Sequence, residues 1–171
     1  MVTNTATRRA LLAAVAVCVL AACAPKPGAP SAGSPAGNPP PAEPAGVASK
    51  DFGDYVVHFN AISTDQLTPE VAKAYNIVRS KNRALLNVSI IKKEEGSIGR
   101  PVPGSVAALV ANDTGQVKDS NLREIREGDA IYYIGDFAVS NAETLVFTVD
   151  ATPINETSRF SVRFTRTFYT E

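Results

Sequence analysis

Residues 144–151 read TLVFTVDA, and this stretch has the clearest regular pattern in the chain of 171 residues. Leu145, Phe147 and Val149 fall on one side of an extended segment, and the two threonines and the aspartate fall on the other. Successive side chains of a β-strand point to opposite faces, so this alternation predicts a strand with one face in an apolar core. Residues 160–168 repeat the pattern and predict a similar strand at the end of the chain.

Other segments upstream alternate in the same way or form short apolar runs, which raises the number of strand candidates to seven. Turn sequences rich in Gly, Asn and Asp separate some of these candidates. The remaining candidates are residues 55–62, 84–91, 105–110, 117–126 and 131–139.

A short helix is predicted between the first two strand candidates. Thr68 is a suitable N-cap, Pro69 suits the first helical position, and Glu70 complements the positive end of the helix dipole. Asn76 or Ser80 marks the region in which the helix should end. The full pattern predicts a mainly β domain, an antiparallel β-sandwich of immunoglobulin-like type with about seven strands and one short helix. A small barrel is the alternative, and the strand order is left open.

Composition divides the chain into parts. All twelve aromatic residues lie between Phe52 and Tyr169, whereas eight of the twelve prolines lie between Pro25 and Pro44. A segment without aromatic residues or an apolar period cannot bury enough surface to offset the entropy of ordering it. We therefore expect a Pro/Ala/Gly-rich disordered tether at residues 23–50 and the sandwich domain at residues 51–171.

The N-terminus has the pattern of an export signal. Arg8 and Arg9 precede the apolar run 10–22, which is too short to span a bilayer. The sequence LAAC at residues 20–23 resembles a bacterial lipobox, which implies a signal peptide at residues 1–22 and lipid attachment at Cys23. This predicts a palmitate-bearing lipoprotein of the outer membrane with its domain in the periplasm. A soluble exported protein cleaved after Ala22 is the alternative, and the export route, general secretory or twin-arginine, is left open.

Several segments of the domain resemble one family when they are taken in order. They read DYVVHFNA at 54–61, LTPEVA at 67–72, SKNRALLNV at 80–88, REGDAIYY at 126–133 and FYTE at 168–171. The chain is similar in these segments to the domain of unknown function family 4426, small exported proteins of gammaproteobacteria. The resemblance implies the domain boundaries and the compartment, and it brings no activity or catalytic residue with it.

The chemical repertoire of the domain argues against several functions. His58 is the single histidine, both cysteines precede the domain, and the one methionine starts the chain. We therefore predict no metal site, no cofactor and no catalytic residues. Seventeen basic residues balance seventeen acidic ones, so a nucleic-acid partner is not expected.

Candidate partner-binding residues come from two places. Arg79, Lys81 and Arg83 put three cations into the connection before a buried strand, and they suit an acidic partner or anionic headgroups. A solvated connection whose long side chains cover apolar surface is the alternative. His58 and Asn60 share the more polar face of their strand, where a plain surface role is the alternative.

Three functions follow as hypotheses. The first is a non-enzymatic interaction or accessory module that binds an envelope protein through a sheet face or edge. The second is a small-ligand carrier with a pocket in the sandwich, and the third is a cell-wall hydrolase, which the missing histidines and cysteines disfavour. Residues expected in a carrier pocket are Tyr55, Tyr75, Tyr132 or Phe137.

Arg166 departs from the pattern of its strand, because it shares the parity of the inward-facing Phe164 and Phe168. Either a bulge displaces it, or it points inward and is held by a carboxylate such as Asp54 or Asp136.

Overall fold

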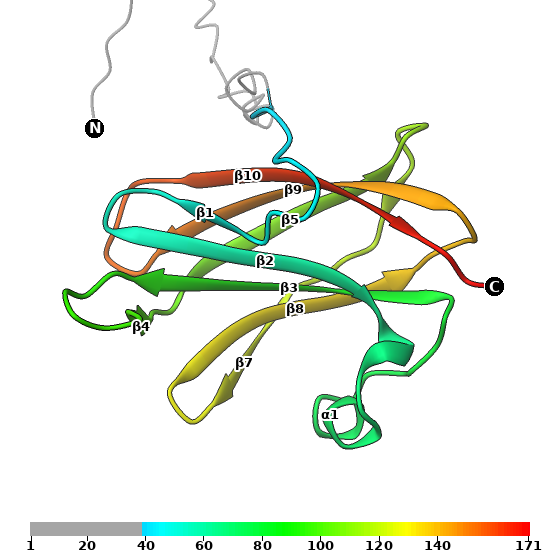
Figure 1. Ribbon diagram of the computed structural model, residues 1–171, viewed down its shortest axis with the longest axis horizontal. Helices are drawn as coiled ribbons and strands as arrows, with labels where there is room; N and C mark the ends of the chain where they lie inside the picture. Colours follow the sequence, from blue (N-terminus) through cyan, green and yellow to red (C-terminus); the bar gives the residue numbers. More distant parts are fainter. Residues whose placement is uncertain (1–38) are drawn as a thin grey trace, which may run out of the picture. The chain divides into compact units, whose positions relative to one another are not determined.

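The computed structural model of the protein describes residues 39–171 (Figure 1). The predicted signal peptide, the predicted lipid attachment at Cys23 and the first part of the predicted tether lie outside these described residues. Within residues 39–171, the helices are too short to cross a membrane.

The described chain forms two antiparallel sheets that pack face to face, which confirms the predicted sandwich. The first sheet has the order β1-β2-β3-β8-β7, and β4 pairs with β3 beside that path. Its strands are β1 (Ser49–Asp51), β2 (Tyr55–Ser63), β3 (Arg83–Lys92), β4 (Arg100–Pro101), β7 (Arg123–Glu127) and β8 (Ala130–Ala138).

The second sheet has the order β10-β9-β5-β6. β9 is the longest strand, and the alternation seen at residues 144–151 lies in it. Its partner β10 pairs with it in register from Phe160↔Ala151 to Phe168↔Glu143. The strands of this sheet are β5 (Gly104–Asn112), β6 (Val117–Lys118), β9 (Glu143–Pro153) and β10 (Phe160–Phe168).

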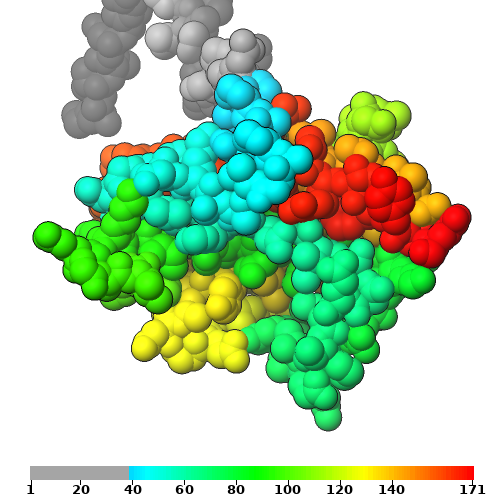
Figure 2. Space-filling model, in the orientation of Figure 1, coloured from blue at the N-terminus to red at the C-terminus, as the bar shows by residue number. Residues whose placement is uncertain are grey.

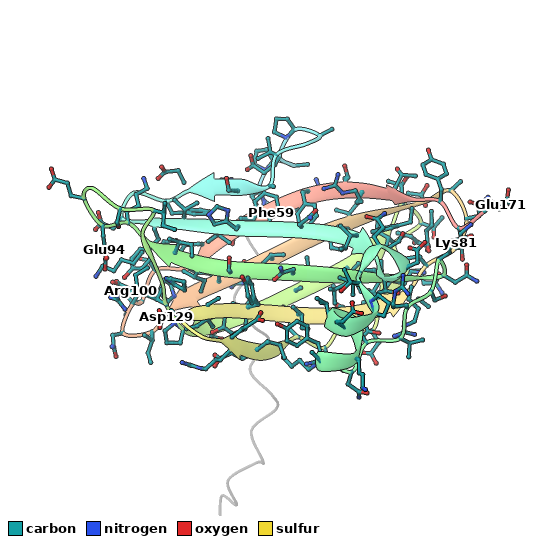
Figure 3. The ribbon with its side chains drawn as sticks, turned by 60° about the horizontal axis from the view of Figure 1, so that its bottom comes forward. Phe59, Lys81, Glu94, Arg100, Asp129 and Glu171 are labelled. Carbon is teal, nitrogen blue, oxygen red and sulfur yellow. The ribbon has the colours of Figure 1, made fainter. Side chains whose placement is uncertain are left out.

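Aromatic rings connect the two sheets through the middle of the core. Phe164 of β10 stacks on Phe147 of β9, with ring centroids 4.6 Å apart, and lies 4.8 Å from the ring of Phe59 on β2. Phe137 of β8 extends this cluster, since its ring lies 5.9 Å from that of Phe147. Buried aromatic pairs add stability beyond the area they remove from water. Figure 3 shows Phe59 near the middle of the domain, as this packing requires.

The prediction of a single strand at residues 117–126 is wrong, because the chain crosses from the second sheet to the first within this segment. Its start is β6 in the second sheet, and its end is β7 in the first. The crossing passes close to β8, where a Cβ added to Gly135 would lie 2.9 Å from the Asn121 carbonyl oxygen. The alternation of residues within a segment does not reveal such a change of sheet.

The predicted helix is present as α1 (Pro69–Ala74), preceded by the 3-10 helix η1 (Thr64–Gln66). Thr68 is its N-cap, and its Oγ1 accepts a hydrogen bond from the Val71 N–H at 3.3 Å. The chain then turns at Asn76, whose φ of 53° lies in the left-handed region that asparagine tolerates. α1 lies against the outer face of the first sheet, where Ala72 is buried.

Regular structure begins inside the segment assigned to the tether. The Glu43 N–H donates to the Arg163 carbonyl oxygen of β10 at 2.6 Å, and β1 then pairs with β2. Lys50 Nζ lies 2.6 Å from Glu43 Oε1, and Val47 packs against the core. We call residues 42–51 the N-terminal strap, because they lie across one edge of both sheets (Figure 1).

Candidate functional site

The predicted basic cluster lies at one end of the sandwich, where two of its cations contact the fold itself. Arg83 Nε donates to Asp136 Oδ2 of β8 at 2.9 Å, and Arg79 Nη2 donates to the Asp65 carbonyl oxygen at 2.8 Å. Lys81 forms no ion pair with any residue of the part that the structure describes. In Figure 3 Lys81 lies at the same end of the domain as Glu171.

His58 and Asn60 lie elsewhere, on the outer face of β2. Their neighbours across the ladder are Ser89 and Asn87 of β3, so four polar side chains share this part of the sheet. Both His58 and Asn60 are exposed. The structure therefore separates the five predicted partner-binding residues into two groups.

A hollow that the sequence analysis did not predict lies on the outer face of the first sheet, beneath α1. It has a volume of about 270 Å³, and we call it the outer groove. Figure 2 shows the α1 segment, in green, projecting beside the yellow β7–β8 hairpin that forms the opposite wall. The residues that line the outer groove are Asn60, Ile62, Leu67, Val71, Tyr75, Leu85, Asn87, Ile125, Glu127, Tyr132 and Ile134.

The outer groove is apolar along its floor and polar at certain points. Leu85 and Ile134 form the floor and pack together with Ala72 of α1. Asn87 Oδ1 is buried and has no hydrogen-bond partner within residues 39–171. A buried carbonyl oxygen of this kind costs free energy until a donor reaches it.

The rim of the outer groove carries a hydrogen bond between a tyrosine and a carboxylate. The Tyr75 hydroxyl donates to Glu127 Oε2 at 2.5 Å, which ties the end of α1 to β7. This hydrogen bond raises the pKa of Tyr75, because the phenolate would lie beside a carboxylate. Arg123 also donates to the Tyr75 carbonyl oxygen, so α1 is tied to β7 at two points.

The residues expected to line a carrier pocket lie in two different places. Tyr75 and Tyr132 line the outer groove, on the outside of the sandwich. Tyr55 and Phe137 are buried in the packed core between the sheets. These four residues therefore do not line a common pocket inside the sandwich.

One sequence signal was available for the outer groove. Near its start β3 contains Ala84-Leu85-Leu86, which places apolar side chains on both faces of the sheet, and β8 does so at Tyr133-Ile134. A strand that is apolar on both faces indicates that another element covers its outer side. The pattern did not reveal that α1 would cover this face only in part.

Arg166 keeps its inward position without a bulge, since Arg166 pairs with Leu145 in an unbroken register. Its Nη2 donates to Asn60 Oδ1 of β2 at 3.2 Å, across the edge of the sandwich. Neither expected carboxylate holds it, because Asp136 pairs with Arg83 and Asp54 makes no bond to it.

Comparison with known proteins identifies relatives of this chain. The family model described as Domain of unknown function (DUF4426) matches residues 49–171. A crystal structure of a DUF4426 family protein from Pseudomonas aeruginosa has 32% sequence identity and a TM-score of 0.61. That similarity covers 72% of this chain and 94% of the other. A search of curated proteins gave no match.

A more distant structure shares the fold. A copper-bound variant of FetP from uropathogenic Escherichia coli strain F11 has 12% identity and a TM-score of 0.52, covering 72% of this chain and 95% of that one. Identity this low shows similarity of fold alone. Residues 39–171 of the present chain contain no cluster of three or more His, Cys, Asp or Glu that would hold a metal ion.

Proposed function

The chain belongs to the DUF4426 family, and we propose that it is a membrane-tethered module that binds another protein of the bacterial envelope and catalyses no reaction. The observation that carries this proposal is the outer groove, an open apolar hollow on a sheet face beside a short helix. The family name assigns no activity, and the surface of this chain is what supports the proposed function.

The dimensions of the outer groove favour a protein segment as the occupant. Its volume of about 270 Å³ falls just below the range of roughly 300–1,000 Å³ typical of small-molecule sites. A hollow of this size takes one or two apolar side chains that project from a partner. Covering the apolar floor stabilises a complex by about 25 cal/mol per Å² of apolar surface removed from water.

Polar groups around the outer groove would determine the orientation of the bound partner segment. The Asn87 Oδ1 is buried without a partner among the described residues, and a small rotation of its side chain would let it accept a hydrogen bond from a backbone or side-chain N–H of the partner. Asn60 lines the groove, and His58 continues the polar surface along β2 away from it. Of the predicted candidates, Asn60 thus lines the outer groove and His58 lies beside it, whereas Arg79, Lys81 and Arg83 form a separate surface.

The N-terminal sequence supports the proposed location. A lipobox-like LAAC sequence and a proline-rich segment precede the strap. Acyl chains on Cys23 would hold the domain at the outer membrane, facing the periplasm, and residues 24–41 would give it reach. A domain held this way searches for partners at a high local concentration near the membrane.

Site-specific photo-crosslinking in intact cells tests the proposal. The photoreactive residue replaces Val71, which is 39% exposed at the rim of the outer groove, or Lys81 in the basic cluster. We expect a discrete protein adduct from position 71 that disappears when Ile125→Trp fills the groove. Leu109→Trp adds the same side chain to an exposed position on β5 and should leave the adduct intact.

Either of two results would contradict the groove as the contact surface. One is an adduct from position 71 that survives Ile125→Trp in a folded protein, and the other is an adduct from position 81 alone. The second result would instead favour the basic cluster of Arg79, Lys81 and Arg83.

A small-ligand carrier is the second candidate function, and the unpaired oxygen of Asn87 favours it specifically. An apolar molecule with one hydrogen-bond donor would match a groove with an apolar floor and a buried acceptor. Native mass spectrometry of the full chain, released from membranes in mild detergent, tests this. A constant mass in addition to that of the lipidated chain, abolished by Ile125→Trp, would support the carrier, and a protein with no mass beyond the lipidated chain would exclude it.

A further inference from the structure

The N-terminal strap covers only half of the sandwich edge formed by β2 and β10. β1 pairs with β2 as far as His58, and the Phe59 N–H then donates to the Ala48 carbonyl oxygen at 2.9 Å. On β10, the contact with the strap is at Arg163. Among the described residues, no strand pairs with the outer side of β2 at residues 60–63 or of β10 at residues 164–168.

Unpaired backbone groups therefore face outward on β2. The N–H of Phe59 points to the strap, and alternation along a strand directs the N–H and C=O groups of Ala61 and Ser63 the same way. A free edge of this kind is a template for another extended chain.

A groove follows this uncovered edge. It has a volume of about 340 Å³, and we call it the edge groove. In Figure 2 the red end of β10 lies directly beside the cyan strap, above the blue-green end of β2. The lining residues are Asn60, Ala61, Ile62, Ser63, Gln66, Arg166, Thr167, Phe168 and Tyr169.

Arg166 gives the edge groove a positive charge that has no counter-ion within residues 39–171. One guanidinium nitrogen reaches Asn60 Oδ1 at 3.2 Å, while Arg166 Nε is buried with no hydrogen-bond partner. No carboxylate within residues 39–171 forms an ion pair with Arg166. The planar guanidinium matches a carboxylate, which satisfies two N–H donors at once.

We propose that the edge groove binds an extended acidic segment of another protein, which adds antiparallel to β2 beyond the end of β1. Its backbone pairs with Ala61 and Ser63, and the carboxylate of an Asp or Glu side chain binds Arg166. β1 already shows this geometry on the first half of the same edge, where it pairs antiparallel with β2.

The remainder of the chain itself does not fit this role. Residues 1–38 contain no Asp or Glu, so they have no side-chain carboxylate for Arg166. Residues 24–41 also contain seven prolines, which lack the N–H that a ladder requires. Charge complementarity thus points to a different chain as the occupant.

The inference is independent of the outer groove, although Asn60 and Ile62 line both hollows. A variant that fills the outer groove, Ile125→Trp, should leave binding at the edge groove unchanged. An experiment can therefore contradict one of the two proposals without contradicting the other.

Nuclear magnetic resonance with synthetic peptides tests the edge groove. The full chain is labelled with ¹⁵N, purified in detergent and titrated with the acetylated and amidated pentapeptide Thr-Val-Glu-Val-Thr. We expect the amide signals of Ala61 and Ser63 to shift. The peptide with Gln in place of Glu should bind about ten-fold more weakly, because it cannot form the charge-assisted pair.

Variants of the protein complete the test. Arg166→Gln should weaken the Glu peptide about ten-fold, and Arg166→Lys should retain part of the affinity if the Gln variant folds poorly. Arg163→Gln removes the same charge from the same strand and should change the affinity less than two-fold. A Glu peptide that is N-methylated on the amides facing β2 should not bind.

Three results would overturn the proposal. They are the absence of shifts at Ala61 and Ser63 with millimolar Glu peptide, equal affinity of the Glu and Gln peptides, and unchanged affinity of the folded Arg166→Gln variant. Shifts confined to the outer-groove residues would likewise contradict binding at the edge.

Discussion

Lys118 and Glu143 form an ion pair that holds the short edge strand β6 onto its sheet. Their side chains are 16% and 12% exposed, with Nζ and Oε1 2.6 Å apart. Glu143 Oε2 also accepts the Ser140 N–H at 2.9 Å. Burial alone would raise the pKa of Glu143, but the bonds from Lys118 and Ser140 outweigh it, so the pKa lies below its ordinary value.

This ion pair predicts a specific loss of stability in acid. The pKa of Glu143 is lower in the folded state than in the unfolded state, so its ionised carboxylate stabilises the fold. This stabilisation is fully present above the unfolded pKa of about 4.3, and it is lost as the pH falls through the folded-state pKa. Glu143→Gln should lower the free energy of unfolding by about 2 kcal/mol at pH 7. Near pH 3 the difference between the wild type and the variant should be smaller. Urea unfolding measured at both pH values checks the result.

Glu94→Gln is the matched control, because its ion pair with Arg100 leaves the two side chains 47% and 60% exposed. Exposed pairs contribute well under 1 kcal/mol, so this variant should unfold as the wild type does. If the two substitutions lowered the free energy of unfolding equally, the buried pair with Lys118 would contribute no more to stability than the exposed pair does.

The inward position of Arg166 was predictable from the sequence, whereas its partner was not. Alternation along residues 160–168 placed it with Phe164 and Phe168. The contact with Asn60 depends on how the edge strands of two sheets face each other, and that arrangement arises only in the folded domain.

At the scale of elements, α1 is a short helix whose position forms one wall of the outer groove. A helix of six residues has little stability of its own, so its cap and its contacts with the sheet maintain it. The sequence signals for the cap were strong, since Thr68 and Pro69 stand together, and the structure confirms them.

Loss of the cap should loosen α1 without unfolding the sandwich. Thr68→Ala removes the acceptor for the Val71 N–H and should cost about 1 kcal/mol of helix stability. Hydrogen exchange is the measurement, and amides 71–74 should exchange several-fold faster while those of β9 stay protected. Thr165→Ala, at an exposed position of β10, should change neither set.

The crossing between β6 and β7 shows what strand patterns leave undetermined. Residues 117–126 carry only three apolar side chains, and their alternation is compatible with either sheet. The assignment to sheets depends on long-range pairing, with β6 bound to β5 and β7 bound to β8. The outer groove escaped prediction for a similar reason, because it requires α1, β3, β7 and β8 to be placed together.

At the scale of the whole molecule, the stacked rings of Phe164 and Phe147 and their neighbour Phe59 make the two sheets one cooperative unit. Phe164→Ala should destabilise the domain by about 4 kcal/mol, because it removes a 3% exposed side chain from between both sheets. Chemical denaturation followed by circular dichroism measures the change. Ile154→Ala, at a 57% exposed position, should cost less than 0.5 kcal/mol.

At the scale of the whole molecule, the proposed attachment to the membrane depends on Cys23, the predicted site of lipid attachment. Cys23→Ser removes the thiol that would carry the lipid, so we expect the protein to move from the membrane pellet to the soluble periplasmic fraction. Fractionation and intact-mass measurement detect the change. A wild-type protein without added acyl mass would contradict the lipoprotein prediction and favour the soluble exported alternative.

The N-terminal strap also determines the order in which contacts would break if the chain were pulled from its N-terminal side. A pull that arrives along the chain from residue 41 loads the Glu43 contact with Arg163 first, before the tension reaches the hydrogen bonds of β1. The strap can therefore peel from β10 and then from β2 while the aromatic core stays closed. Each step would lengthen the connection and lower the force on the sheets, so in the proposed lipid-anchored protein the strap would protect the aromatic core from a pull at the N-terminal end.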